Sequence, residues 1–476
     1  MMSLVEPAGI LSPRLRPLTI GLLLTVTAVA FEALAVATVL PVTVRELGGL
    51  SLYGWAFSAF FLTNVVGISV WGTQADRHGP RRPYAYGLGL FGLGLVIGGL
   101  APSMPVLVLG RAVQGMGAGA LSSTLYVSIG IGYPGPAKAH MLAALSSAWV
   151  VPGLIGPAIA GLVATHASWR LVFLGLLPVL VLAGTLTLRA LRQLPGPARA
   201  ADESTGDGEP VPSGRFWTSV RLAAGASLLL AGLSSRHLWL LVPLVIVGAT
   251  MAGPALRRLL PLGTLRADPG IPAAILSRGA LTFAFFGTEA FLTLALTSTR
   301  HLSPAAAGLC LTGAATSWAS GSWMQARVGG TWTRRRSGVL GASLVAAGIA
   351  ITATALIASV PVAVAPLGWV IAGLGMGFTY QVGTLVVLEE APPNQVGQLS
   401  SALQLAELIS VAVATGAGGA IIGAVVRHAG TRRAGIALVD VMTVIAALVC
   451  VAVCTRLPRR ATPPTHEANE IQRIAP

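Results

Sequence analysis

The sequence predicts an all-α polytopic membrane protein, and three observations support that fold class. Of 476 residues, 54% are hydrophobic and only 10% are charged, whereas about a quarter of the residues in a soluble globular domain carry charge. The chain contains 58 glycines, which are common where transmembrane helices approach closely. Its apolar runs reach the length of about 20 residues that a helix needs to cross a bilayer. The three cysteines lie in apolar runs, so neither a disulfide nor a zinc site is expected.

Six candidate spans open the chain, near 17–44, 52–72, 84–101, 104–131, 138–164 and 168–188. Residues 189–216 are hydrophilic and rich in Pro, Gly and acidic side chains, which predicts a flexible cytoplasmic linker. Two shorter apolar runs and then six further spans follow, at 217–234, 237–254, 272–299, 304–326, 337–358, 362–388, 397–425 and 434–455. We therefore expect 14 transmembrane helices, arranged as an N-terminal six-helix bundle (1–188), two inserted helices (217–254), a C-terminal six-helix bundle (255–460) and a cytoplasmic tail (461–476).

Lys and Arg set the expected orientation, because cytoplasmic loops carry an excess of them. With the amino terminus inside, the inner segments hold 21 of the 31 basic residues, the outer loops hold seven, and three lie within spans. Both termini are therefore expected in the cytoplasm, with the chain in the inner (cytoplasmic) membrane. The same clustering accounts for the net charge of +15 without nucleic acid as a partner.

The chain repeats a glycine pattern. The fourth span contains four glycines, Gly110, Gly115, Gly117 and Gly119. They recur 258 residues later as Gly368, Gly373, Gly375 and Gly377. With nearly the same offset, Glu32 corresponds to Glu289 and Gly72 to Gly330. This predicts two pseudo-symmetric bundles that arose by duplication, with the two extra helices inserted between them. Transporters built from repeats place the substrate site near the bilayer midplane between the repeats.

Residues 72–82 form a short charged segment between the second and third spans. Its charged side chains could not lie in hydrocarbon without a large cost, so a tight loop at the membrane surface is expected. A carboxylate among arginines at a helix end can hold one neighbouring helix end and release another. The segment is therefore a candidate latch, formed by Gly72, Asp76, Arg77, Gly79, Arg81 and Arg82. The alternative is a basic loop that only fixes the topology.

Ionisable residues inside spans are functional candidates by default. Arg111 needs an acceptor because a guanidinium stays protonated, and Glu32 is the expected partner. Moving one relative to the other could load or release a proton; a permanent pair that only fixes helix packing is the alternative. Asp440 lies near Arg432 and Arg433 in the sequence, so a structural salt bridge is expected there.

Glu289 is the expected substrate contact, because Phe285 and Phe286 lie one turn away and aromatic rings with a carboxylate suit an amphipathic cation. Further candidate substrate contacts are Gln114, Trp318 and Tyr380. Glu407 is a second membrane carboxylate. The repeat provides it with no motif arginine, since Trp369 stands where the first half has Arg111.

The second copy of the charged loop differs from the first. Arg334 stands where the first copy has Asp76, so only the first loop is expected to act as a latch. Glu389 and Glu390 lie at the inner end of their span and are expected to face the cytosol. No histidine cluster resembles a metal site, and no phosphate-binding loop indicates ATP as the energy source.

Several of these motifs resemble those of the major facilitator superfamily. Residues 72–82 are similar to the family's loop Gly-x-x-x-Asp-Arg-x-Gly followed by basic residues, with Pro80 as a departure. Arg111 to Gly119 resembles the fourth-helix motif Arg-x-x-Gln-Gly, which the family associates with proton transfer. The end of the first span, Glu32 to Pro41, resembles the first-helix motif of 14-span drug:proton antiporters, with Glu32 where aspartate is usual.

The fifth span resembles the motif Gly-Pro-x-x-Gly-Gly of the family's exporting members. Ala160 replaces one glycine, and Pro152 stands where a more distant glycine is expected. Small residues allow close helix crossing and a proline bends the helix, which suits a rocking interface; ordinary membrane packing uses the same residues. The motif residues here are Gly153, Gly156, Pro157 and Gly161.

The resemblance implies a proton-driven efflux pump for hydrophobic or amphipathic compounds, cations included, that bind between the two bundles. Proton coupling would fall to Glu32, Arg111, Glu289 and Glu407, and the proton gradient would replace any cofactor. We expect a monomer in the lipid bilayer and no enzyme activity. A lipid or metabolite exporter of the same fold is the alternative. A membrane receptor or embedded enzyme would need a sizeable cytosolic domain or a catalytic constellation, and the sequence offers neither.

Overall fold

The computed structural model describes residues 9–193, 214–235, 237–328, 331–392 and 395–459, and all regular structure within them is helical. The first half contains α1 (Arg16–Leu47), α2 (Trp55–His78), α3 (Arg81–Gly99), α4 (Met104–Gly132), α5 (Gly135–Ser147), α6 (Val150–His166), α7 (Arg170–Leu174) and α8 (Leu177–Leu191). The inserted helices are α10 (Gly214–Ser234) and α11 (Leu238–Leu259). The second half contains α12 (Ile271–Thr299), α13 (Pro304–Val328), α14 (Arg334–Thr354), α15 (Val364–Glu390), α16 (Val396–Ala429) and α17 (Arg432–Cys454). Two short 3₁₀ helices complete the set, η1 (Leu50–Leu52) and η2 (Thr264–Arg266).

Eleven helical segments in the described ranges are long and apolar enough to cross a membrane. The helices that fall outside this group are α3, α13 and the pair α5–α6. The polytopic, all-helical prediction is therefore confirmed, whereas the count of 14 spans stays a prediction.

Two predicted spans are each broken into two helices. The span expected at 138–164 divides after Ser147, and the span expected at 168–188 divides after Leu174. Proline explains both breaks, because it has no N–H for the carbonyl four residues earlier. Pro152 leaves the carbonyl of Ala148 without its helical donor, and Pro178 in the first turn of α8 does the same for Leu174.

The segment predicted as a charged loop at 72–82 is mostly helix. Helix α2 continues to His78 and α3 begins at Arg81, so only Gly79 and Pro80 form the turn. Gly79 has φ +81°, a conformation that glycine adopts without strain. Asp76 and Arg77 therefore lie in the last turn of α2, and their side chains are outside the described part of the structure.

The glycine repeat proves to be a packing repeat. In α4, a Cβ added at Gly115 or Gly119 would strike the backbone of α2, and one added at Gly110 or Gly117 would strike the backbone of α3. The second copy repeats the pattern on α15. Gly373 and Gly377 face α13, and Gly368 and Gly375 face α14. Helices α13 and α14 are therefore the structural counterparts of α2 and α3.

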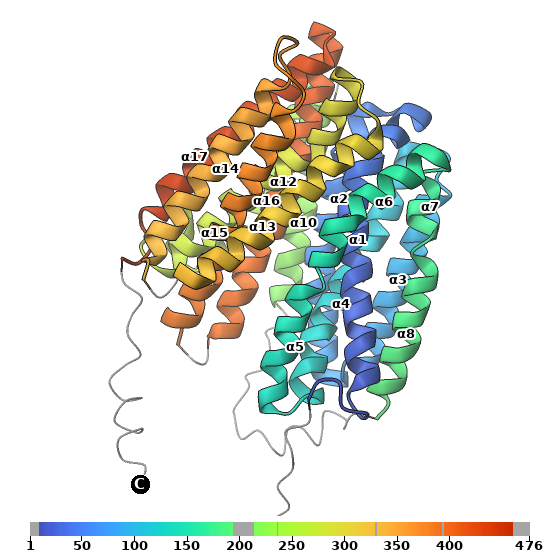
Figure 1. The fold of residues 1–476 in the computed structure, drawn as a ribbon, viewed down its shortest axis with the longest axis vertical. Coiled ribbons are helices and arrows are strands. Elements are labelled where there is room, and N and C mark those ends of the chain that lie inside the picture. The colour runs from blue at the N-terminus through green and yellow to red at the C-terminus, as the bar shows by residue number, and fades with distance from the viewer. Residues whose placement is uncertain (1–8, 194–213, 236, 329–330, 393–394, 460–476) are drawn as a thin grey trace, which may run out of the picture.

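The two halves meet mainly along two helix pairs, α2 with α16 and α6 with α13, and α1 also contacts α12 and α13. The Ser58 hydroxyl donates to the carbonyl of Ala412 at 2.8 Å and lies 3.0 Å from the Thr415 hydroxyl. We call the end of the molecule at which α8 ends and α10 begins the linker end. In Figure 1 the ribbons of the two halves converge at the opposite end and separate toward the linker end.

The inserted helices contact both halves. Helix α10 packs on α2 and on α16, with Leu222 and Leu230 in a common apolar cluster with Leu62 and Ile409. Helix α11 packs on α10, where Gly225 of α10 and Gly248 of α11 allow the two backbones to meet closely. The insertion therefore lies against α2 and α16, one of the helix pairs that join the halves.

Candidate functional site

The residues Glu32 and Arg111 form a buried ion pair in the N-terminal half. Arg111 on α4 contacts the carboxylate of Glu32 on α1, and both side chains are 2% exposed. Its guanidinium also donates to the Gln114 side chain at 2.8 Å and to the Ala56 carbonyl at 2.9 Å. The guanidinium carbon lies 4.3 Å from the centre of the Phe60 ring. Arg111 therefore ties α1, α2 and α4 together.

The polar atoms around this ion pair do not all have hydrogen-bond partners. The second oxygen of Glu32, Oε2, and the amide nitrogen of Gln114 are buried and have no hydrogen-bond partner among the described residues. A buried polar atom without a partner costs about 1–3 kcal/mol. The site therefore offers a buried carboxylate oxygen that is open to a proton.

A second ion pair joins Arg278 on α12 to Glu407 on α16, with 3.1 Å between Nη1 and Oε2. The Tyr380 hydroxyl on α15 donates to the same carboxylate oxygen at 2.9 Å, and Arg278 donates to Thr384 at 2.9 Å. Its guanidinium lies 3.6 Å from the centre of the Tyr380 ring. Glu407 has no motif arginine, since Trp369 stands at that position, but Arg278 on α12 is an arginine partner that the sequence analysis missed. The signal was available, because an arginine inside a span needs an acceptor.

The two pairs differ in accessibility. Arg278 is 5% exposed, but the Glu407 side chain is 22% exposed. Tyr126 on α4 lies against Gln404 on α16, one turn from Glu407, and is 52% exposed. Glu407 is thus the more accessible carboxylate, at a place where the two halves approach each other.

The predicted aromatic substrate contacts form one connected cluster. Phe285 stacks on Trp369 with ring centres 4.6 Å apart and meets Phe286 and Trp318 edge-on. Trp318 in turn meets Tyr380 at 5.2 Å. The cluster therefore runs to the Arg278–Glu407 pair, and Trp369 is a member that the sequence did not predict.

Glu289 lies beside this cluster without a partner. The residue is 8% exposed, and its side chain forms no hydrogen bond or ion pair with the described residues. The indole nitrogen of Trp369 is also buried without a partner. The repeat gives Glu289 a tryptophan where Glu32 has Arg111, so this carboxyl has lost the countercharge that its counterpart keeps.

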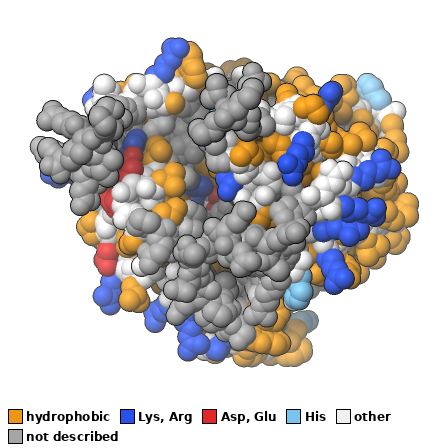
Figure 2. Space-filling model, turned by 90° about the horizontal axis from the view of Figure 1, so that it is seen from below, with side chains coloured by type: hydrophobic (Ala, Val, Ile, Leu, Met, Phe, Trp, Pro, Cys, Tyr) orange, Lys and Arg blue, Asp and Glu red, His pale blue; other side chains and the backbone are white. Residues whose placement is uncertain are grey.

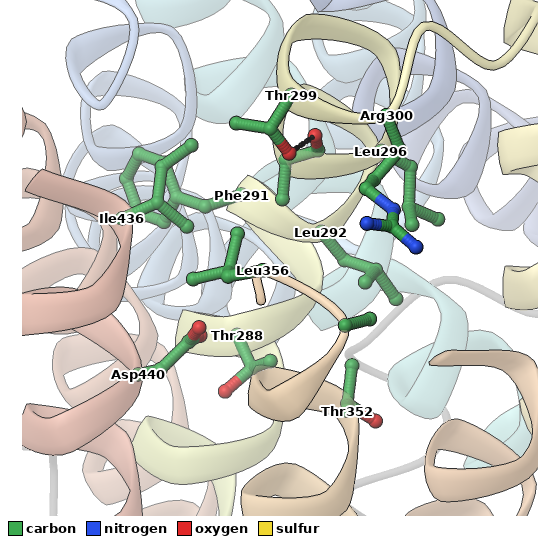
Figure 3. A pocket seen from close by; sticks show the side chains of 12 residues that line it. Thr288, Phe291, Leu292, Leu296, Thr299, Arg300, Thr352, Leu356, Ile436 and Asp440 are labelled. Carbon is green, nitrogen blue, oxygen red and sulfur yellow. Dashed lines mark hydrogen bonds between the residues drawn. The ribbon is translucent and has the colours of Figure 1, made fainter. Parts of the chain in front are cut away.

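Asp440 lines a small pocket between α12, α14 and α17 (Figure 3). Thr288 lies beside Asp440, and Arg300 lies on the far side of the pocket, where it donates to the carbonyls of Ile357 and Ala358. The salt bridge expected from Arg432 and Arg433 is not formed by these described residues. Eight residues of helix separate Asp440 from Arg432, or about 12 Å along the axis, which is too far.

Arg334, at the start of α14, binds both carboxylate oxygens of Glu389 on α15. Glu389 and Glu390 are both exposed, so the expectation that they face the cytosol stays a prediction. The second loop lacks an acid of its own, but the neighbouring helix supplies one. This pair lies within one half, so it joins α14 to α15 and does not bridge the halves.

The glycine and proline motif of the fifth span lies at the contact between halves. A Cβ at Gly161 would strike the backbone of Ala305 on α13, and the Pro157 carbonyl lies against Gly308 on α13. Gly153 also faces α13, whereas Gly156 faces Phe31 on α1. For the predicted latch, Arg81 and Arg82 are exposed and form no ion pair among the described residues, so the latch stays a prediction.

Comparisons with known proteins agree with this architecture. The family model described as Major Facilitator Superfamily matches residues 20–415. A probable multidrug-efflux transporter of Mycobacterium tuberculosis is 26% identical over 406 residues, which cover 81% of this chain and 83% of that protein. A multidrug transporter protein of Bacillus subtilis is 31% identical over 179 residues, 37% of this chain and 33% of that protein. The vacuolar basic amino acid transporter 5 of Saccharomyces cerevisiae is 32% identical over 166 residues, 35% of this chain and 28% of that protein.

Solved structures share the fold at low identity. A bacterial homolog of the human lysosomal transporter Spinster, in an inward-facing conformation, has a TM-score of 0.67 at 15% identity over 93% of this chain and 96% of that chain. A D-xylose–proton symporter has a TM-score of 0.65 at 16% identity over 93% of this chain and 98% of that chain.

Proposed function

The chain belongs to the Major Facilitator Superfamily, and from that premise we propose that it is a proton-coupled efflux pump for hydrophobic and amphipathic compounds, cations included. A member of this family is a membrane transporter and not an enzyme. The multidrug-efflux relative in Mycobacterium tuberculosis, which matches most of both chains, supports efflux as the direction of transport. Alternating access between the two bundles would carry cargo across the cytoplasmic membrane.

The observation that supports proton coupling is a set of three carboxylates within the helices, two of them buried and each in a different electrostatic setting. Glu32 has an arginine beside it and one unpaired oxygen, Glu289 has no partner among the described residues, and Glu407 is partly exposed. Carboxyl groups of this kind inside a membrane mark proton or substrate pathways. In our proposal Glu32 with Arg111 is the proton switch, Glu289 carries a proton, and Glu407 contacts cationic cargo.

The aromatic cluster supports an amphipathic cation as cargo. The Tyr380 hydroxyl donates to Glu407, and Trp318 packs against the Tyr380 ring. Aromatic faces attract a cation while the rings bury its apolar part. Cargo enters at the linker end, where the halves are apart, and lies between the cluster and α4. Protonation of Glu289 and Glu32 from the other side then favours release and resets the cycle.

The linker end is cytoplasmic in this proposal. Cytoplasmic loops carry the excess of basic residues, and in Figure 2 basic side chains gather along one side of that face. Both chain termini would then lie in the cytoplasm. With this orientation, 21 basic residues lie in the inner segments and seven in the outer loops.

The test is proton-gradient-driven ethidium efflux from cells or proteoliposomes, with E32Q, E289Q and E407Q compared with wild type. E390Q is the matched control, since Glu390 is an exposed carboxylate at the end of α15. We expect wild-type and E390Q efflux to collapse with an uncoupler, E407Q to raise the KM for ethidium, and E32Q and E289Q to lose gradient-driven transport. Wild-type efflux in all three variants would make these carboxylates structural.

A cationic metabolite is the second candidate cargo. The local similarity to a vacuolar basic amino acid transporter favours it, since Glu407 would suit such a cation as well. If the folded protein does not transport ethidium but does transport labelled lysine or arginine, this candidate replaces the drug pump.

A further inference from the structure

The inserted helices form an open groove at the linker end that no part of the transport proposal uses. The groove has a volume of about 260 Å³ and lies between the start of α10 and the end of α11. It is lined by Trp217, Thr218, Arg221, Pro254, Ala255 and Arg258. Both helix ends lie where an inner-leaflet headgroup region would meet the protein.

Two arginines line this groove without a carboxylate. Neither Arg221 nor Arg258 forms an ion pair within the described part of the chain. Arg221 makes one long hydrogen bond, 3.4 Å to the carbonyl of Thr250. Two guanidinium groups that face the same groove repel each other unless an anion lies between them. Guanidinium groups also bind phosphate oxygens through paired N–H donors.

The surroundings of the groove indicate that its occupant comes from the bilayer. Trp217 is 68% exposed, and exposed tryptophans gather at the headgroup level of membranes. Above the groove, α11 presents an apolar face, with Val242 50% and Ile246 57% exposed. A ligand that enters the groove therefore has an apolar helix face directly beside its anionic site.

We propose that the α10–α11 groove binds the phosphate of an anionic phospholipid, with Arg221 and Arg258 on the headgroup and the acyl chains along α11. Because α10 packs on both α2 and α16, a bound lipid would hold the insertion against both halves. The inference concerns lipid binding alone and does not depend on which cargo is exported.

Native mass spectrometry of the full chain, released from detergent with phosphatidylglycerol or phosphatidylcholine added, tests the proposal. We expect retained phosphatidylglycerol on the wild type and an apparent affinity at least about a hundredfold weaker in R221Q/R258Q, because the loss of each of the two charged hydrogen bonds weakens binding at least about tenfold. R257Q is the control and is compared with R258Q, which removes the same single charge, because Arg257 is exposed on the same helix and does not line the groove. The substituted arginines are exposed, and an unchanged melting temperature shows that the variants fold.

Three results would overturn the proposal. Phosphatidylglycerol retained by R221Q/R258Q would show that the groove is not its site. An equal loss in R257Q would reduce the effect to general attraction between charges. Displacement of the lipid by millimolar inorganic phosphate would make the groove a site for free phosphate and not for a lipid.

Discussion

At the residue scale, the sequence predicted the partner of Glu32 and missed the partner of Glu407. Arg111 could be paired with Glu32 because both lie in spans of one half and an intramembrane arginine needs an acceptor. Arg278 likewise signalled the need for an acceptor, but its choice of Glu407 depends on the packing of α12 against α16, which the sequence pattern does not specify. The offset of the repeat places Trp369 at the position equivalent to Arg111, so the repeat alone offered no arginine partner in the second half.

The Arg278–Glu407 pair predicts a coupled effect on stability. Removing one charge leaves the other without its ion pair, so we expect R278Q and E407Q each to lower the free energy of unfolding by about 1–3 kcal/mol. The double variant R278Q/E407Q should lose less than the sum of the two, because no unpaired charge is left. Thermal unfolding in detergent measures the three variants.

The control for this cycle is R300Q, since Arg300 bonds only backbone carbonyls in the described structure. Combined with E407Q, it should give additive changes in melting temperature, as distant sites do. Additive changes for R278Q with E407Q would mean that the pair contributes nothing to stability.

At the element scale, proline and glycine determine where helices break and turn, which the apolar pattern does not predict. Hydropathy located the spans, but the breaks before α6 and α8 follow from Pro152 and Pro178. The charged side chains predicted a loop at 72–82, yet the chain stays helical to His78 and turns only at Gly79 and Pro80. Charged residues can remain helical at a membrane surface, because leaving the hydrocarbon does not require leaving the helix.

Gly161 should be the most sensitive position of α6. A Cβ at this position would strike the backbone of α13, which cannot move aside as a side chain can. We expect G161A to force α6 and α13 apart, to lower the melting temperature by several degrees and to slow transport. G89A is the matched control on α3, where an added Cβ meets open space and replacing helical glycine by alanine gains about 1 kcal/mol. A G161A protein as stable and active as G89A would remove close packing as the reason for this glycine.

At the scale of the whole molecule, the sequence predicted a repeated glycine pattern but did not predict how the two halves contact each other. The glycines at an offset of 258 residues predicted two similar bundles, and the structure gives them equivalent packing roles on α4 and α15. Which helices join the halves depends on contacts between residues that are hundreds of positions apart, such as Ser58 with Thr415. The insertion of α10 against both halves was likewise beyond any local pattern.

Alternating access requires the α2–α16 contact to open, and a crosslink there should stop the cycle. The Ser58 and Thr415 hydroxyls are 3.0 Å apart, so S58C/T415C places two thiols within reach of a disulfide that joins the halves. We expect oxidation to abolish efflux and a reductant to restore it in the same sample.

The control T288C/T443C uses side chains with 2.8 Å between their hydroxyls on α12 and α17, within one half. Its oxidised and reduced forms should transport equally, because a rigid bundle can still rock. Efflux that continues at full rate through an oxidised S58C/T415C bond would show that this contact stays closed during transport, and that the opening lies elsewhere.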